Sequence, residues 1–345
     1  MLTVTGSIVA ALPISQFQRF AHQFLLESFQ TRSALVFKAG QWEKQSALDV
    51  EESGTVLTVF AQSLNFHQLE GMITGLADTV TLGSFSRHPL CNIYGDTVLR
   101  AHVEVNDADR LKERLAAVSQ AFHIEVGVQH HQPKLAEPGL LVMDMDSTVI
   151  QIECIDEIAV LAGRGDEVAK VTAKAMRGEL DFNQSLITRV ACLKGVELAK
   201  LEQIRDSLPL TPGIQLLVKE LKMRNWRLAI ASGGFTFFAD YLCQRLGLDD
   251  AISNTLAVEN GVLTGHVGEA IVNAQVKAQA ITELAEQYAI EPAQTIAAGD
   301  GANDLLMMDA AALGVACHAK PVVNDKADVA IRHTGLHSLL YFLEV

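Results

Sequence analysis

The sequence predicts an α/β protein of two domains, the second of which is a Rossmann-like core with a parallel sheet. Apolar runs at residues 140–144, 227–232, 295–299 and 313–316 alternate with segments of helical spacing, as in parallel sheets covered by helices. A helical insertion is expected between the first two strands, at about residues 153–219. The stretch 130–139 contains Pro133 and Pro138 and few apolar residues, which indicates a linker with a domain boundary near residue 136.

The first domain, residues 1–136, is expected to be an α+β, ferredoxin-like domain of the kind found in ACT domains. Strand-like segments occur at 56–62, 80–85, 98–105 and 123–128, and helical segments at 65–76 and 107–122. Residues 1–50 have a weaker pattern, with one helix expected at about 15–28. Because no chemical motif precedes residue 140, we interpret this domain as a regulatory or dimerisation module. In the second case the protein would be a homodimer.

Composition excludes several classes of protein. Of the 345 residues, 49% are apolar, which is enough for two domains with cores of their own. A net charge of −14 without a basic patch argues against a nucleic-acid partner, and no apolar run is long enough to span a bilayer. The five cysteines are scattered without zinc or CxxC spacing, and residues 1–12 lack a basic segment, so we expect a cytoplasmic protein.

Two carboxylates, Asp144 and Asp146, follow the strand at 140–144. The carboxyl end of a strand is where open parallel sheets bind ligands. One acid that attacks and a second that moves a proton are what phosphate-ester hydrolysis through an aspartyl-phosphate requires. A surface turn that happens to carry two acids would show the same pattern, so this pair needs support from other segments.

Two further strand ends supply that support. Ser232, Gly233 and Gly234 follow one strand, where glycine lets the backbone approach an anion and the hydroxyl can donate to a phosphate oxygen. Another strand ends at Gly299 and is followed by three oxygen-bearing side chains, Asp300, Asn303 and Asp304, which suit a hard cation such as Mg²⁺. Helix capping would explain one of these acids but not the cluster.

The order of these motifs resembles that of haloacid dehalogenase-type phosphatases: Asp-x-Asp, Ser-Gly-Gly, Lys277 on a helix at about 275–287, then Gly-Asp-Gly-x-Asn-Asp. The resemblance covers roughly residues 139–345 and narrows to phosphoserine phosphatases through the insertion, which looks like their helical cap. Glu153, Met176, Phe182 and Arg189 match that cap, and Asp181 with Gln184 forms a capping box at the start of one helix.

The resemblance implies a Mg²⁺-dependent hydrolysis of O-phospho-L-serine, the last step of serine biosynthesis. Asp144 would be the nucleophile and Asp146 the general acid and base. The Asp144 side chain, the Asp146 backbone carbonyl and Asp300 would hold Mg²⁺, with Asp304 supporting them from outside. The phosphoryl oxygens would be bound by Ser232, the Gly233 N–H, Asn303 and Lys277, which would also keep Asp144 ionised.

In the cap, Arg189 would take the substrate carboxylate and Glu153 its ammonium, beside Phe182 and Met176. Three alternatives remain. A related capped phosphatase could act on another small ester, such as phosphohomoserine. A non-catalytic amino-acid sensor is disfavoured by the complete set of Asp144, Asp146, Lys277 and Asp300. A P-type pump is excluded because membrane spans are absent and because related pumps carry threonine where this chain has Asp146.

Overall fold

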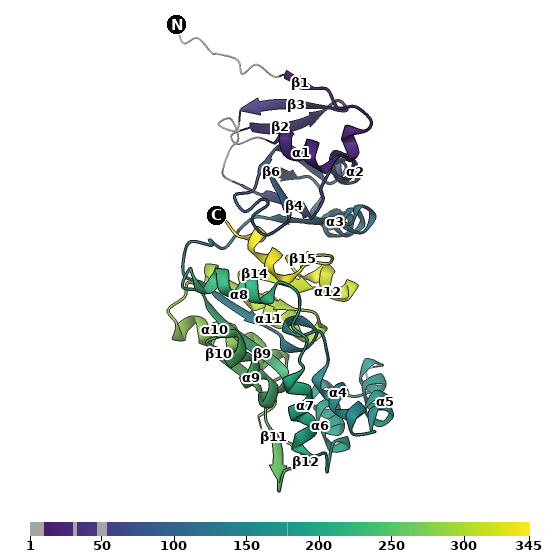
Figure 1. Cartoon of the computed structure of the whole chain (residues 1–345), viewed down its shortest axis with the longest axis vertical. Coiled ribbons are helices and arrows are strands. Elements are labelled where there is room, and N and C mark those ends of the chain that lie inside the picture. Colours follow the sequence, from purple (N-terminus) through teal and green to yellow (C-terminus); the bar gives the residue numbers. More distant parts are fainter. Residues whose placement is uncertain (1–9, 30–32, 47–53, 178, 269) are drawn as a thin grey trace. The chain divides into compact units, whose positions relative to one another are not determined.

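The computed structural model describes residues 10–29, 33–46, 54–177, 179–268 and 270–345 (Figure 1). By their contacts these residues form two compact units. The first contains the chain up to Gln132 together with residues 328–334 and 338–345, and the second contains residues 133–327 and 335–337. Within the described residues, no helix is both long and apolar enough to cross a membrane.

The first unit contains the α+β domain that the sequence predicts. Its strands are β4 (Val56–Ala61), β5 (Val80–Arg87), β6 (Thr97–Val105) and β7 (Glu125–Gln129), with α2 (Phe66–Leu76) after β4 and α3 (Ala108–Phe122) after β6. These strands lie in the order β5-β6-β4-β7 and pair antiparallel. The expected β-α-β-β-α-β arrangement is therefore confirmed, whereas a relationship to ACT domains stays a prediction.

The start of the chain is richer in strands than expected. β1 (Ala10–Leu12), β2 (Ser33–Lys38) and β3 (Gln41–Ser46) extend the sheet in the order β1-β3-β2-β5. The prediction of a single helix at 15–28 is wrong in part. The structure has a 3-10 turn (Gln18–Phe20) and a separate helix α1 (His22–Ser28), because the backbone is extended at Ala21 between them. Buried Trp42 on β3 packs edge-on against the rings of Phe66 and Phe85, which gives the added strands a core.

The last residues of the chain pack within the first unit. The Glu125 carboxylate is buried on β7 and accepts backbone N–H groups from Arg332 at 2.7 Å and Thr334 at 3.1 Å, beside β15 (Val329–Ile331). The Tyr341 hydroxyl donates to the Asp96 carboxylate at 2.9 Å. The sequence pattern places these residues in the second domain, so the domain division near residue 136 stays a prediction.

The second unit has the parallel sheet that the sequence predicts. Its strands are β8 (Leu140–Met143), β9 (Arg227–Phe235), β10 (Asp250–Asn254), β13 (Thr295–Gly299) and β14 (Leu313–Cys317), in the order β10-β9-β8-β13-β14. Its helices outside the insertion are α8 (Ile214–Lys222), α9 (Thr236–Leu246), α10 (Ala274–Gln287), α11 (Leu305–Ala310) and α12 (Pro321–Lys326). The order of strands puts the first core strand, β8, between β9 and β13.

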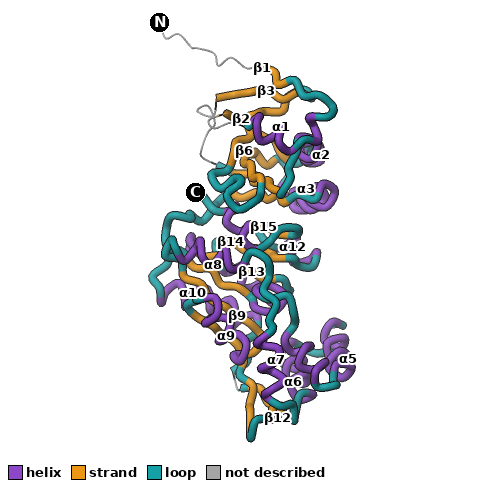
Figure 2. The backbone as a smooth tube through the Cα atoms, viewed as in Figure 1, coloured by secondary structure: helices purple, strands orange, loops and turns teal. Residues whose placement is uncertain are grey.

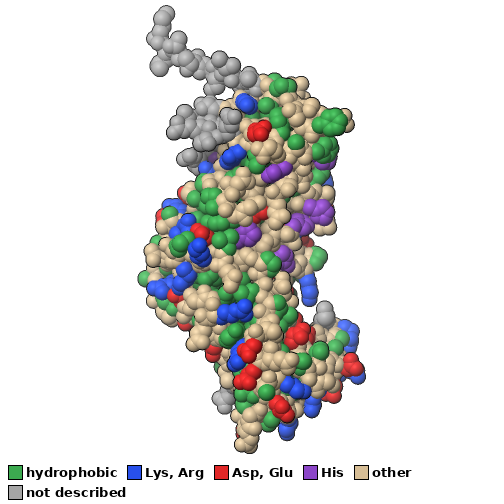
Figure 3. Space-filling view, viewed as in Figure 1, with side chains coloured by type: hydrophobic (Ala, Val, Ile, Leu, Met, Phe, Trp, Pro, Cys, Tyr) green, Lys and Arg blue, Asp and Glu red, His purple; other side chains and the backbone are tan. Residues whose placement is uncertain are grey.

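The described part of the cap contains the helices α4 (Cys154–Leu161), α5 (Gly165–Met176), α6 (Phe182–Cys192) and α7 (Leu198–Asp206). They gather at one end of the second unit beside the hairpin of β11 (Leu256–Glu259) and β12 (Val262–Val267) (Figure 2). On the face shown in Figure 3, acidic and basic side chains are intermixed over these helices. The insertion expected to end near residue 219 would include α8, which packs against β9 of the sheet.

Candidate active site at the carboxyl ends of the strands

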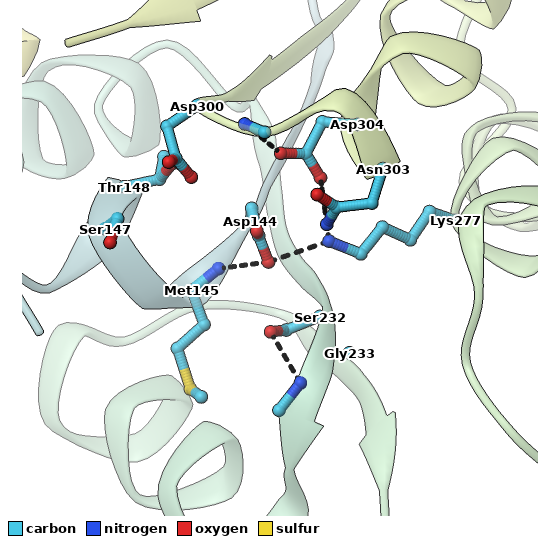
Figure 4. A network of polar contacts seen from close by, with 12 residues as sticks. Asp144, Met145, Ser147, Thr148, Ser232, Gly233, Lys277, Asp300, Asn303 and Asp304 are labelled. Atoms are coloured by element: carbon cyan, nitrogen blue, oxygen red, sulfur yellow. Dashed lines mark hydrogen bonds and ion pairs between the residues drawn. The ribbon is translucent and has the colours of Figure 1, made fainter. Parts of the chain in front are cut away.

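Three neighbouring strands bring the polar side chains of the site together (Figure 4). β8 pairs in parallel with β9 through Met143 and Ile230, and with β13 through Met143 and Ala298. Because parallel strands present their carboxyl ends at the same edge, Asp144, Ser232 and Asp300 meet there although they are far apart in the sequence. The prediction that these strand ends converge is therefore confirmed.

Lys277 on α10 lies between two carboxylates. Its Nζ is 2.8 Å from Oδ1 of Asp144 and 2.7 Å from Oδ1 of Asp304, and all three side chains are buried. Burial disfavours the ammonium, but the charges and hydrogen bonds of Asp144 and Asp304 outweigh it and raise the pKa of Lys277 above its ordinary value. Lys277 is therefore a fixed positive charge next to Asp144.

The backbone after β8 holds Asp144 in a defined orientation. Its Oδ1 accepts the Met145 N–H at 2.8 Å, and its own N–H donates to Ala298 of β13 at 2.9 Å. The chain then turns through Ser147, whose φ of 57° lies in the left-handed region that few non-glycine residues adopt. Since Met145 and Lys277 both hold Oδ1, the other carboxylate oxygen of Asp144 is the one left to react.

An excess of negative charge surrounds Asp300. Carboxylate oxygens of Asp144, Asp300 and Asp304 lie within 4.8 Å of one another. Burial, followed by the charges of Asp144, Asp304 and Glu153, raises the pKa of Asp300 to about 7. Both oxygens of Asp304 are already engaged, one by Lys277 at 2.7 Å and one by the Gly301 N–H at 2.9 Å. Asp144 and Asp300 are therefore better placed than Asp304 to hold a hard cation.

Asp146 has the properties of a proton donor. Its Oδ1 is buried and has no hydrogen-bond partner among the described residues. Burial, with the charges of Glu153 and Asp144, raises the pKa of Asp146 well above its ordinary value. A carboxyl group in this environment keeps its proton more readily than an exposed aspartate, as a general acid must.

The last residues of β9 form a tight cradle next to Asp144 (Figure 4). The Gly234 N–H donates to Oγ of buried Ser232 at 3.0 Å. A Cβ on Gly233 would lie 2.8 Å from the Phe182 ring, and one on Gly234 would lie 2.5 Å from the Met145 side chain. A side chain at either glycine would therefore have to displace a neighbouring side chain, and Phe182 of the cap reaches the core at this end of β9.

The polar cap residues point to a ligand site. Arg189 on α6 has a buried Nε with no partner in the described part of the chain. Burial lowers the pKa of Arg189, and the acids Asp156, Glu153 and Asp146 counteract this effect. Glu153 accepts the Ser147 hydroxyl at 2.8 Å, while burial raises its pKa. Met176 ends α5, but its side chain lies outside the described residues.

Sequence reasoning missed two contacts in the site. The Thr148 hydroxyl donates to Oδ1 of Asp300 at 3.5 Å, and Ser147 holds Glu153. Both residues directly follow Asp146, so their place in the same motif was a signal that could have singled them out. The Asn303 side-chain amide donates to Oδ1 of Asp304 at 3.3 Å.

Comparisons with known proteins agree with this geometry. A family model for haloacid dehalogenase-like hydrolases matches residues 139–312. A phosphoserine phosphatase of Vibrio cholerae is 51% identical over 71% of this chain and 74% of its own length. One of Haemophilus influenzae is 52% identical over 64% of this chain and 70% of its own length.

Solved structures extend the similarity. The unliganded structure of a probable phosphoserine phosphatase from Vibrio cholerae has a TM-score of 0.72 at 42% identity and covers 94% of this chain and 93% of its own. A phosphoserine phosphatase with an analogue of the phospho-aspartyl intermediate has a TM-score of 0.57 at 38% identity, over 60% of this chain and 100% of its own.

Proposed function

Because this chain belongs to the haloacid dehalogenase-like hydrolases and is a phosphoserine phosphatase, we propose which of its residues carry each step of phosphoserine hydrolysis. Asp144 attacks the phosphorus atom and becomes an aspartyl-phosphate. Two features support this role: its position at the carboxyl end of β8, and the fixing of one oxygen by Met145 and Lys277. The free oxygen is thereby aimed into the site.

Asp146 transfers the protons of both half-reactions. It protonates the serine oxygen as the ester bond breaks, and the resulting carboxylate then removes a proton from the water that hydrolyses the aspartyl-phosphate. The raised pKa of Asp146 supports the first of these roles, because the carboxyl must carry its proton before it can donate it. Expulsion of serine leaves the same group ionised and ready to act as a base.

A divalent cation, which we propose to be Mg²⁺, fits the acidic cluster. Asp144, Asp300 and the backbone carbonyl of Asp146 would hold it, and Asp304 would support Lys277 and the Gly301 turn. The donor set consists of oxygens only, and the raised pKa of Asp300 marks negative charge that lacks a counter-ion. When bound, such an ion polarises the phosphoryl group and offsets its repulsion by the carboxylates.

The phosphoryl oxygens are held by the Ser232 hydroxyl, the Gly233 N–H, Asn303 and Lys277. Each can donate a hydrogen bond, and such contacts strengthen as charge spreads over the oxygens in the transition state. The burial of Ser232 and Lys277 supports the proposal, since donors in a water-poor site do not need to be reoriented during the reaction.

The cap selects phosphoserine through its serine portion. Arg189 grips the carboxylate, and its buried unpartnered Nε supports this role. Glu153 receives the ammonium, held towards it by the Ser147 hydroxyl. Phe182 covers the aliphatic part, and its close approach to Gly233 supports this contact. Met176 is assigned to the same part of the substrate by the family resemblance alone.

Cellular location and assembly are parts of the same proposal. We expect the enzyme to work in the cytoplasm, because its five cysteines are odd in number and scattered along the sequence without CxxC or zinc spacing. The first unit would serve regulation or dimerisation, which size-exclusion chromatography with light scattering can test. A panel of phosphate esters that includes phosphohomoserine decides whether the site prefers phosphoserine.

The observation that carries the mechanism is the convergence of Asp144, Lys277 and Asp300 at one sheet edge. The decisive experiment measures phosphate release from L-phosphoserine by the parent enzyme, by Asp144→Asn and by Asp309→Asn, an exposed aspartate on α11 that serves as a matched control. Asp144→Asn should be inactive and the control unaffected. Borohydride trapping during turnover should label Asp144, and a label on any other residue would refute the assignment of the nucleophile.

A further inference from the structure

Asn254 is a buried amide for which the mechanism above has no role. It is the last residue of β10 and is 1% exposed, at a break in the pairing register between Ser253 and Asn254. Its Nδ2 donates to the Gly233 carbonyl at 2.8 Å, and its Oδ1 accepts the Val272 N–H at 2.8 Å. The two partners fix the orientation of the amide, since only nitrogen can donate to a carbonyl and only oxygen can accept from an N–H.

The contact with Gly233 determines where the next peptide N–H points. In a trans peptide the C=O and the following N–H point in opposite directions. With the Gly233 carbonyl held by Asn254, the Gly234 N–H is directed to the other side of the chain, where it donates to Ser232 Oγ at 3.0 Å. A hydroxyl that accepts one hydrogen bond keeps its own hydrogen for another acceptor.

We propose that Asn254 is a positioning residue that makes the Ser232 hydroxyl a donor towards the phosphoryl group. Three hydrogen bonds connect these groups, and together they are called the relay below. The Val272 N–H donates to Asn254, the Asn254 amide donates to the Gly233 carbonyl, and the Gly234 N–H donates to Ser232 Oγ. Without Asn254, the Gly233 peptide can rotate, and Ser232 can then turn its hydrogen towards a protein carbonyl. This inference rests on the role in phosphoryl binding proposed for Ser232 and Gly233.

The surroundings of Asn254 allow the relay to be tested without opening the neighbouring hairpin. Residues 255–271 contain β11 and β12, whose base is closed separately by the Gly268 N–H donating to the Thr255 carbonyl at 2.8 Å. The cap also pairs with this hairpin, with the Gly195 N–H 2.7 Å from the Leu263 carbonyl. The hairpin should therefore stay in place when the Asn254 amide is lost.

Two substitutions and one matched control separate the relay from general stability. Asn254→Ala removes the amide. Asn254→Asp keeps the size of the side chain and its bond from Val272, but when it is ionised it cannot donate to the Gly233 carbonyl. In the control, Asn324→Ala, the deleted amide also donates to a backbone carbonyl at 2.8 Å, that of Ala319 near α12. Both Asn254 variants should lower kcat/KM on the order of tenfold or more, as expected for an impaired phosphoryl-oxygen donor. The control should not.

The loss should be equal for L-phosphoserine and p-nitrophenyl phosphate, because both present the same phosphoryl group. It should also depend on Ser232: in a Ser232→Ala background, Asn254→Ala should cause little further loss. Full additivity of the two losses would overturn the relay. A loss in Ser232→Ala with none in either Asn254 variant would overturn this inference alone. An unchanged kcat/KM in Ser232→Ala would refute the proposed role of Ser232 and the relay with it.

Discussion

Lys277 Nζ lies 2.8 Å from Asp144 Oδ1, so that a helix late in the chain neutralises a carboxylate at the end of the first core strand (Figure 4). The same Nζ lies 2.7 Å from Oδ1 of Asp304, and both carboxylates are buried. Asp144, the proposed nucleophile, and Asp304 therefore share one cation. This arrangement makes Lys277 important for both activity and stability.

Replacing Lys277 by methionine should both inactivate and destabilise the enzyme. Methionine keeps much of the volume of the lysine side chain, but it leaves the buried carboxylates of Asp144 and Asp304 without their cation. Such a loss typically lowers the free energy of unfolding by about 3–5 kcal/mol. Urea unfolding measures this loss. The matched control is Lys222→Met, because the partner of Lys222, Asp249, keeps Arg227 at 2.9 Å and the Leu228 N–H at 2.8 Å. Equal destabilisation by the two substitutions would show that the Lys277 pairs add nothing beyond an ordinary ion pair.

Chelation of divalent cations should abolish phosphoserine hydrolysis, and added Mg²⁺ should restore it. Ca²⁺ should support little activity, since its larger and looser shell would misplace the phosphoryl group for in-line attack. Because the pKa of Asp300 is raised to about 7 without a cation, Mg²⁺ must displace a proton below that pH, and its affinity should fall as the pH drops from 8 to 6. Calorimetry at several pH values tests this trend. Full activity in excess chelator would refute the cation site.

Arg189→Ala should impair phosphoserine hydrolysis far more than hydrolysis of p-nitrophenyl phosphate, which has no carboxylate. Loss of a buried charge-assisted pair costs roughly 2–5 kcal/mol, on the order of a hundredfold or more in kcat/KM. Glu153→Gln should show the same selectivity through the ammonium. The control is Arg177→Ala, which removes another arginine of the cap region whose side chain is 58% exposed and pairs with Glu179. Equal losses of kcat/KM on both substrates would mean that Arg189 stabilises the cap and does not bind the substrate carboxylate.

A chain that begins at Leu135 should keep the catalytic residues but lose stability at its C-terminal end. Without the first unit, Tyr341 loses Asp96, and Tyr341 and Phe342 lose the ring of Phe60, with centroids at 5.0 and 5.4 Å. Exposed aromatic surface of this kind favours aggregation. Light scattering compares this variant with one that carries polar substitutions at Tyr341 and Phe342. If the shorter chain is monodisperse and as stable as the parent, the packing of these residues is dispensable.

Stability of the first unit should fall as the pH drops from about 6.5 to 4. Burial, with a smaller effect of Arg100, lowers the pKa of His88 to about 4, and Nδ1 accepts the Leu90 N–H at 3.1 Å. Between these pH values His88 is protonated in the unfolded chain but not in the folded chain. The free energy of unfolding therefore falls by up to about 3 kcal/mol. Urea unfolding followed by Trp42 fluorescence, in a Trp226→Phe background, reports on this unit. His88→Asn cannot titrate and should flatten the dependence; an equally steep dependence would assign it to other groups.

Much of the candidate site could be predicted because its signals are local. Apolar runs that end in Asp144, Ser232 and Asp300 identify strands and their carboxyl ends, and parallel pairing then requires those ends to meet. The helix that carries Lys277, expected at about 275–287, begins at Ala274 and ends at Gln287. The resemblance to known phosphatases added roles that no periodicity could supply.

By itself the sequence thus determined the fold class, the parallel core, the acidic motifs and the family, because each of these is encoded in short windows of residues. Only the tertiary structure decided that the C-terminal residues pack around Glu125 and Asp96, that α8 packs against β9 of the sheet, and that the Asn254 amide donates to the Gly233 carbonyl. These outcomes depend on contacts between distant residues: Asn254 meets Gly233 and Val272 across 21 and 18 positions of the chain. A buried polar group takes whichever partner the packed chain brings within reach, and local sequence does not record that partner.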